Sequence, residues 1–265
     1  MIRSETDASW ILVTHPDHAR ITGEFADAWG NERFARPEPY AAIRHAVYHH
    51  DDGWLARDAA PSLTGAGKPE AFTSALVGAY SAFEEIDLPA YLGVRARATA
   101  EVAAQDAYAG IVVSMHTYNL LTEQADASTI RPEHRAAYET FLTEQLAWQR
   151  ATGQRLGANE AELRRAFEFL QCCDSLSLIV CSGYAQPRDL RHTHADRSGA
   201  RHAVRCTPRG GGVYALDPWP LGVASFPLNV RRRVIDKAAT QSLEDFRTAF
   251  AAAPVEIDEI MLVPV

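Results

Sequence analysis

An apolar run with helical spacing ends in four consecutive side chains that can bind a metal or carry protons, namely His49, His50, Asp51 and Asp52. Polar groups are costly to pack beside a hydrophobic face unless a partner compensates them. A divalent cation is a common partner, because neutral imidazole and carboxylate are among its natural ligands. The segment therefore predicts a metal site where this helix ends.

Three side chains in other parts of the chain are candidates to complete the site. Asp174 lies in an apolar helical segment between Cys173 and Cys181, where we expect its carboxylate to be buried and therefore paired or coordinated. The alternative is that serines or an arginine form hydrogen bonds with it. His116 also lies in an apolar helical segment, where it is either a ligand or a hydrogen-bonded core residue. His18 lies inside a predicted helix near the start of the chain.

Two pairs of neighbouring histidines offer alternative ligands. For the first ligand we favour His18 over His15, because His18 is inside the predicted helix whereas His15 is placed to help cap it. For the second we favour His50 together with Asp51, because both can bend toward one cation where the chain leaves helical geometry. His49 would then lie beside the site, although it remains an alternative ligand.

A second group on the same helix is a candidate for catalysis. His45, His49 and Asp52 fall on one helical face, which could hold the metal itself or orient the residues that do. We predict His49, Tyr48 and Asp52 as catalytic residues, with His49 carrying protons or orienting the substrate. Tyr48 and Trp54 would form a wall of the pocket, or would belong to the core.

The order of these residues resembles that of the HD superfamily, which are helical metalloproteins named for an adjacent His-Asp pair. The resemblance lies in the His-Asp-x-Gly turn at residues 50–53, in a lone His18 one helix earlier and in a lone Asp174 on a late helix. It covers residues 14–184, and the whole chain also resembles a bacterial family of uncharacterised proteins with this pattern and a β-rich tail. The resemblance implies these metal ligands: His18, His50, Asp51, His116 and Asp174.

The rest of the pattern predicts a mainly α fold, an HD-like helical bundle with a small C-terminal β-rich layer that the N-terminal strand joins. The chain would form a single domain, 1–265, with a helical metal-binding core at 14–184 and a β-rich cap at 200–265 together with 9–13. The predicted helices cover residues 14–29, 39–53, 70–85, 90–123 with a break near 92–93, 132–156, 158–184 and 243–252. The predicted strands cover residues 9–13, 203–207, 212–216, 224–233 and 257–265, and the predicted loops cover 58–69 and 191–201.

Composition excludes several classes of protein. The chain has 265 residues, of which 47% are hydrophobic and 23% charged, as in an ordinary globular protein. No apolar run reaches the roughly 18–20 residues that span a bilayer, and the first residues lack the apolar core of a signal peptide, so we expect a cytoplasmic protein. A net charge of −8 argues against a general nucleic-acid binder. The four cysteines form no Cys-x-x-Cys pair, and we expect them to be reduced and buried.

For the function we favour a non-haem iron oxygenase. The same order of residues occurs in inositol oxygenase and in the phosphonate-cleaving HD oxygenases. Those enzymes use two further histidines between the His-Asp pair and the final aspartate, whereas here only His116 is well placed. The resemblance therefore implies one Fe(II), or an incomplete pair of irons, with a small organic molecule and dioxygen as substrates.

Two other functions remain as alternatives. The first is an HD-type phosphohydrolase that uses Mn, Mg, Ni or Zn, although Trp54 follows the glycine of the turn where many such enzymes carry lysine. The second is a metal-stabilised binding protein, although structural sites are usually closed and rich in cysteine.

Overall fold

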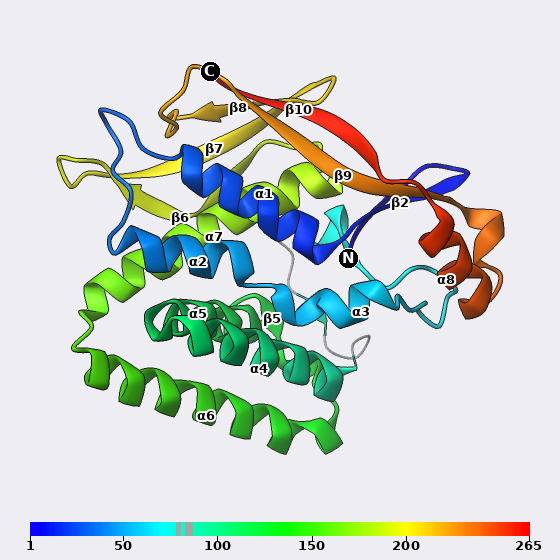
Figure 1. Ribbon diagram of the computed structural model, residues 1–265, viewed down its shortest axis with the longest axis horizontal. Coiled ribbons are helices and arrows are strands. Elements are labelled where there is room, and N and C mark those ends of the chain that lie inside the picture. Colours follow the sequence, from blue (N-terminus) through cyan, green and yellow to red (C-terminus); the bar gives the residue numbers. More distant parts are fainter. Residues whose placement is uncertain (78–80, 83–86) are drawn as a thin grey trace.

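The computed structural model describes residues 1–77, 81–82 and 87–265 (Figure 1). The helices are α1 (His15–Ala28), α2 (Tyr40–His49), α3 (Leu55–Ala59), α4 (Leu88–Gln105), α5 (Ala107–Thr122), α6 (Pro132–Leu156), α7 (Glu160–Ser182) and α8 (Leu243–Ala252). The strands are β1 (Ile2–Glu5), β2 (Ser9–Val13), β3 (Phe72–Thr73), β4 (Ser81–Ala82), β5 (Ala125–Asp126), β6 (Arg188–Ala195), β7 (Arg201–Gly210), β8 (Val213–Asp217), β9 (Phe226–Asp236) and β10 (Glu256–Pro264).

Strands from both ends of the chain form one eight-stranded mixed sheet in the order β3-β1-β2-β9-β10-β8-β7-β6. Its pairs are antiparallel except for β1 with β3 and β10 with β8. The pairing of β2 with β9 places Trp10 opposite Ile235 and joins the first strands to the last. Helix α7 contacts both β6 at one edge of the sheet and β1 near the other edge, so the sheet curls around this helix.

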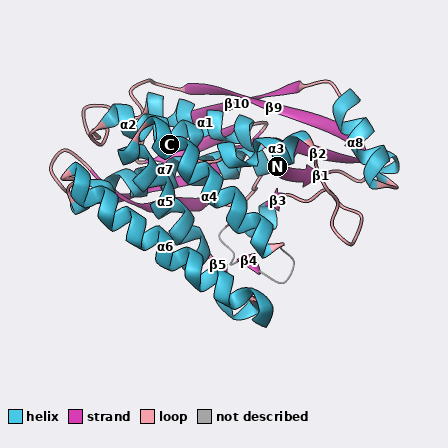
Figure 2. Ribbon diagram, turned by 60° about the horizontal axis from the view of Figure 1, so that its bottom comes forward, coloured by secondary structure: helices cyan, strands magenta, loops and turns pink. Residues whose placement is uncertain are grey.

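Most helices lie in layers on the inner side of the curled sheet, whereas α8 packs against Trp10 and Ile235 on the other face. Helices α1 and α7 pack against each other and against strands of the sheet. Helix α5 contacts α2, α4, α6 and α7, and α6 lies farthest from β9 and β10 in both ribbon views (Figures 1 and 2). The part of α7 from Ala166 to Ser177 is thus enclosed on all sides, because every one of its residues is buried.

The prediction of a mainly α, HD-like bundle with a small β-rich layer is wrong, and the description all-alpha is wrong with it. The sheet is large and extends past the predicted cap, because β1, β3 and β6 were not expected. Strand β6 overlaps the start of the segment 191–201 that was predicted as a loop. It buries only Leu190 and His194 fully, so it lacks a hydrophobic alternation, and a bulge with a positive φ at His192 interrupts it.

Two helix predictions also differ from the structure. Residues 72–76 form a short strand and a 3-10 turn instead of a helix, and the rest of that predicted helix includes residues 78–80 and 83–86, which lie outside the described residues. The long helix over 90–123 breaks at Asp106 and not at Leu92–Gly93. The Asp106 side chain accepts a hydrogen bond from the Ala109 amide and caps α5.

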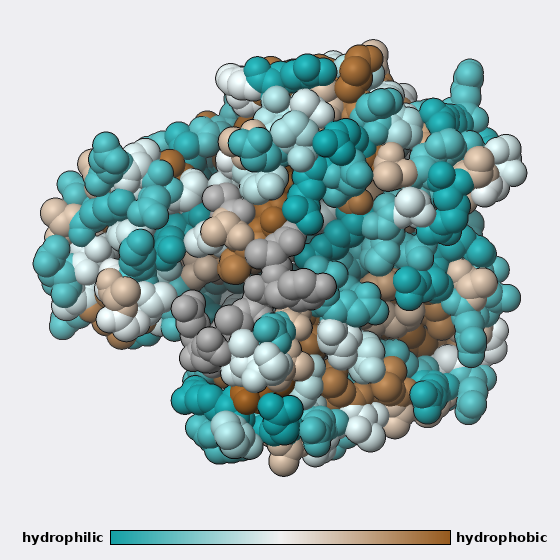
Figure 3. Space-filling view, turned by 180° about the vertical axis from the view of Figure 1, so that it is seen from behind, coloured by the Kyte–Doolittle hydropathy of each residue, from teal (hydrophilic) through white to brown (hydrophobic). Residues whose placement is uncertain are grey.

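The cysteine prediction is confirmed: all four cysteines are free and buried. Among the described residues, no helix is long and apolar enough to cross a membrane. The face seen from behind is mostly hydrophilic, with hydrophobic side chains showing in its lower part (Figure 3).

A close backbone contact positions the turn that follows α2. A Cβ atom at Gly53 would lie 2.4 Å from the Val94 carbonyl oxygen and 3.0 Å from the Ala98 amide nitrogen, both in α4. Backbone atoms of a packed helix cannot move away easily, so only glycine lets this turn approach α4.

The variant Gly53→Ala should therefore lose about 1–3 kcal/mol of unfolding free energy, measured by urea denaturation. The matched control is Gly93→Ala in α4, where an added Cβ meets open space and should cause no loss. Equal stability of Gly53→Ala and the wild type would show that the turn can shift without cost.

Candidate metal centre

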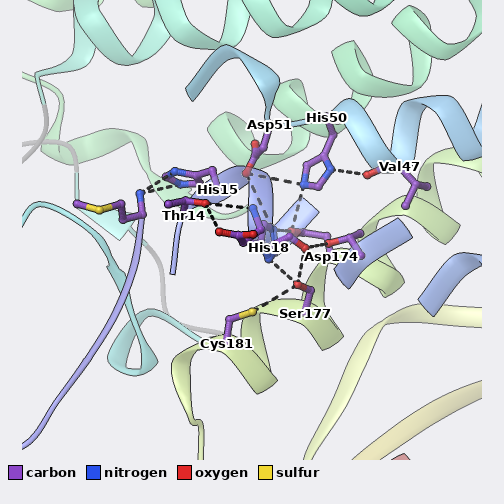
Figure 4. A network of polar contacts seen from close by, with 12 residues as sticks. Thr14, His15, His18, Val47, His50, Asp51, Asp174, Ser177 and Cys181 are labelled. Carbon is purple, nitrogen blue, oxygen red and sulfur yellow. Dashed lines mark hydrogen bonds and ion pairs between the residues drawn. The ribbon is translucent and has the colours of Figure 1, made fainter. Parts of the chain in front are cut away.

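Four helices bring the five predicted metal ligands together in the interior. The residues are His18 in α1, His50 and Asp51 at the end of α2, His116 in α5 and Asp174 in α7, and each is at most 4% exposed. Donor atoms of His18, His50 and Asp174 lie within 4.8 Å of one another, as do those of His50, Asp51 and His116. Figure 4 shows His18, His50, Asp51 and Asp174 pointing toward one another. We call these five residues the His/Asp cluster.

His18 is held by the helix that faces it. Ser177 donates its hydroxyl hydrogen to the His18 carbonyl oxygen at 2.9 Å, and its oxygen lies 2.6 Å from His18 Nδ1. The Ser177 oxygen therefore accepts a hydrogen bond from the Nδ1–H group. In this neutral tautomer Nε2 carries the lone pair that can bind a metal. His18 Nε2 lies 3.0 Å from Asp174 Oδ1. A neutral nitrogen and a carboxylate oxygen this close require a cation, either a proton or a metal, between them.

His50, at the end of α2, is also oriented by a hydrogen bond to one of its ring nitrogens. Its Nδ1–H group donates to the Val47 carbonyl oxygen at 2.8 Å, and its buried Nε2 has no hydrogen-bond partner. That Nε2 lies 3.5 Å from Asp174 Oδ1 and 3.8 Å from Asp51 Oδ2. Burial alone would lower the pKa of His50, but the two carboxylates outweigh it and raise the pKa to about 9.

The two carboxylates of the cluster are held in the charged form. Burial would raise the pKa of Asp51, but the Arg95 guanidinium, whose Nη1 donates to Oδ1 at 2.6 Å, holds that pKa well below its usual range. Burial would likewise raise the pKa of Asp174, which His18 and His50 lower. Two buried carboxylates thus face one buried guanidinium, so the cluster needs one further positive charge, which a protonated imidazole or a metal ion supplies.

Arg95 is a residue of the site that the sequence analysis missed. It is 7% exposed on α4, in the same buried stripe as Leu92, Thr99 and Val102. A lone cation at helical spacing within an apolar stripe requires a buried anionic partner, and this signal was available in the sequence.

His116 completes the cluster from α5. Its ring centroid lies 5.2 Å from that of His50 at an interplanar angle of 84°, and its buried Nδ1 has no hydrogen-bond partner. Burial lowers the pKa of His116 to about 3, so its ring is neutral at physiological pH. It therefore offers a free lone pair.

The His/Asp cluster fits a divalent cation on two independent grounds. His50 Nε2 and His116 Nδ1 are buried nitrogen atoms without partners, which is rare for buried polar atoms in proteins. The second carboxylate also needs a positive charge besides Arg95, and a metal ion supplies it when the imidazoles are neutral. A set of imidazole nitrogens and carboxylate oxygens is typical of transition-metal sites.

The residues predicted as catalytic lie outside the cluster. Tyr48 donates its hydroxyl to Asp27 Oδ2 at 2.8 Å on the side of α2 that packs against α1. His49 Nδ1 lies 2.7 Å from Asp52 Oδ2, and the His49 side chain is 42% exposed. Consecutive residues of a helix point in different directions, so the inward position of His50 turns His49 outward.

The structure also separates the two N-terminal histidines. His15 Nδ1 lies 3.1 Å from Asp58 Oδ2, and its ring stacks on Trp54 with centroids 4.4 Å apart. His18, one turn later, is the histidine that reaches the cluster. Trp54 lies beside the cluster, because the Arg95 guanidinium is 5.5 Å from the Trp54 ring centroid.

The comparisons with known proteins give one match. The family described as "Protein of unknown function (DUF3891)" matches residues 1–237, a range that includes the whole His/Asp cluster. No curated protein and no solved structure matches the chain.

Replacement of the two N-terminal histidines tests which of them is a ligand. His18→Gln should weaken the binding of Co(II), a spectroscopic probe, by about 100-fold or more, because it removes a donor atom from the cluster. His15→Gln should bind Co(II) as the wild type does, since His15 contacts Asp58. Titrations followed by visible absorbance measure both affinities, and equal weakening in the two variants would contradict the assignment.

Metal binding should compete with the proton on His50. The pKa of about 9 means that this ring is protonated at neutral pH without metal, and its Nε2 must lose the proton to bind a cation. The affinity for Co(II) should therefore rise with pH between about 6 and 9, by up to about tenfold per unit. His116, with a pKa of about 3, does not contribute a proton in this range.

Calorimetry in buffers with different ionisation enthalpies would measure the proton released for each Co(II) bound. Heats that are independent of the buffer, with an affinity that does not change with pH, would show that His50 is not a ligand.

Proposed function

Since the chain belongs to the DUF3891 family, whose function is unknown, we propose from the His/Asp cluster that it is a metal-dependent enzyme. The observation that carries the proposal is a buried set of three imidazoles and two carboxylates in which two nitrogens have no partner. The order of these residues along the chain, which resembles that of the HD superfamily, supports the same conclusion. Structural metal sites are usually closed and rich in cysteine, whereas no cysteine belongs to this donor set.

We favour Fe(II) as the metal and a non-haem iron oxygenase as the function. His18, His50 and Asp174 form a group of two imidazoles and one carboxylate, which is the donor set typical of non-haem Fe(II) oxygenases. Asp51 and His116 are further candidates to hold the metal. Fe(II) in this place would supply the activation of dioxygen for the oxidation of a small organic substrate.

Residues around the donor set keep it ready to bind a metal. Ser177 and the Val47 carbonyl each fix one imidazole, so that the nitrogen left free faces the carboxylates. Arg95 keeps Asp51 ionised and in a fixed orientation. The burial of α7 excludes bulk water, which strengthens every electrostatic interaction within the cluster.

An HD-type phosphohydrolase with Mn, Mg, Ni or Zn is the second candidate. Arg95 is the observation that favours it, because a guanidinium fixed at the cluster is suited to bind the oxygens of a phosphate group. The identity of the bound metal and its response to oxygen separate the two candidates.

Elemental analysis of protein purified without oxygen, with absorption spectra before and after exposure to air, tests the proposal. We expect about one iron per chain and a spectral change with oxygen. Asp174→Asn should lose the iron and keep its helix content. Asp58→Asn, which alters a buried carboxylate paired with His15, should keep the iron.

Manganese, magnesium, nickel or zinc without a response to oxygen would favour the phosphohydrolase instead. The absence of bound metal from the wild type, with no uptake of added metal, would overturn both candidates.

A further inference from the structure

A hollow lies between β6 and the C-terminal half of α7, two elements that contact each other. Its wall includes Phe72, Ser175, Leu178, Ile179, Arg188 and Arg191. The lining thus combines apolar side chains with two arginines of β6. The Asp174 carboxylate is close enough to Arg191 to act on its pKa, so the hollow lies near the proposed metal centre.

Neither guanidinium has an acidic partner among the described residues. Arg191 Nη1 donates to the Gln171 amide oxygen at 2.8 Å, and Arg188 Nη1 donates to the Val77 carbonyl oxygen at 3.4 Å. The one carboxylate on the wall, that of Asp189, pairs with Arg205 at 2.9 Å. The hollow therefore contains two positive charges without a bound counter-ion from the described part of the chain.

The position of Arg191 is set by α7. Its backbone N–H donates to Ser175 Oγ at 3.1 Å, and its side chain is held by Gln171. Gln171 is fully buried and donates in turn to Asn119 Oδ1 at 3.1 Å. Residues on either side of Asp174 in α7 therefore hold Arg191, Ser175 through its backbone and Gln171 through its guanidinium.

The charges around Arg191 favour an anion. Burial lowers the pKa of Arg191, the Asp174 carboxylate offsets part of this effect, and the nearby Arg188 guanidinium adds to it. Two guanidinium groups that repel each other at one hollow would be stabilised by an oxyanion between them, and their planar donor groups match carboxylate and phosphate oxygens.

A second hollow, inside the curled sheet, differs in this respect. It is lined in part by Arg232, which already forms ion pairs with Asp258 and with Glu256. The Arg232 guanidinium thus already has carboxylate partners, unlike those of Arg188 and Arg191.

We propose that Arg188 and Arg191 bind the anionic group of the substrate, and that the substrate is a small organic molecule bearing a carboxylate or a phosphate. The assignment of this anion to the substrate rests on the proposed function, whereas the anion site itself does not. The apolar side chains Phe72, Leu178 and Ile179 would contact the carbon part of such a molecule.

Calorimetric titration of the purified protein with inorganic phosphate and with acetate, at constant ionic strength, tests the site. Arg191→Met and Arg188→Met should each weaken binding of the preferred anion by about tenfold or more, because each removes a charge-assisted hydrogen bond. Arg131→Met, which alters an exposed arginine at the start of α6 that lies near Glu133, should bind as the wild type does. Circular dichroism verifies that each variant is folded.

The variant His18→Gln separates this site from the metal centre, because it weakens metal binding and leaves both arginines in place. Retained anion binding in His18→Gln, with loss in the arginine variants, supports the proposal even if the wild type holds no metal. A preference for phosphate or for acetate then identifies the class of substrate. The proposal is overturned if neither anion binds at millimolar concentration, if the arginine variants bind as the wild type does, or if only His18→Gln loses binding.

Discussion

The structure depends on the burial of one charge, the carboxylate of Asp174, in the middle of a helix that is enclosed on all sides. A buried ion is stable only when opposite charges and hydrogen-bond donors surround it. His18 from α1 and His50 from the end of α2 approach the carboxylate to 3.0 and 3.5 Å. The relative positions of α1, α2 and α7 are therefore linked to the electrostatics of this single group.

The curled sheet is what encloses this helix. Strand β2 from the first part of the chain pairs with β9 from the last part. Strands near both edges of the resulting sheet, β1 and β6, contact α7. On the opposite side, α5 brings His116, and α4 brings Arg95 to Asp51. Gly53 allows the turn after α2 to lie directly on α4, so that Asp51 and Arg95 can meet.

The charges of the interior are arranged in order from the core outward. Two carboxylates and three imidazoles form the donor set that we propose for a cation, and Arg95 balances one of the carboxylates. Beyond Asp174, toward the surface, Arg188 and Arg191 line a hollow without acidic partners among the described residues. The proposed cation site beside the proposed anion site would suit a substrate with one reacting end and one charged end.

The sequence by itself determined which residues form the His/Asp cluster. His18, His50, Asp51, His116 and Asp174 are polar groups in apolar helical segments, and such groups need compensation wherever the segments pack. Tertiary structure decided the size of the sheet. It also decided that His50 rather than His49 faces the cluster, and where Arg95 and Arg191 lie. These features depend on pairing between segments far apart in the chain, and local periodicity describes only the faces of each segment. Strand β6 illustrates the reason, because it is recognisable as a strand only through its packing on α7 and its pairing with β7.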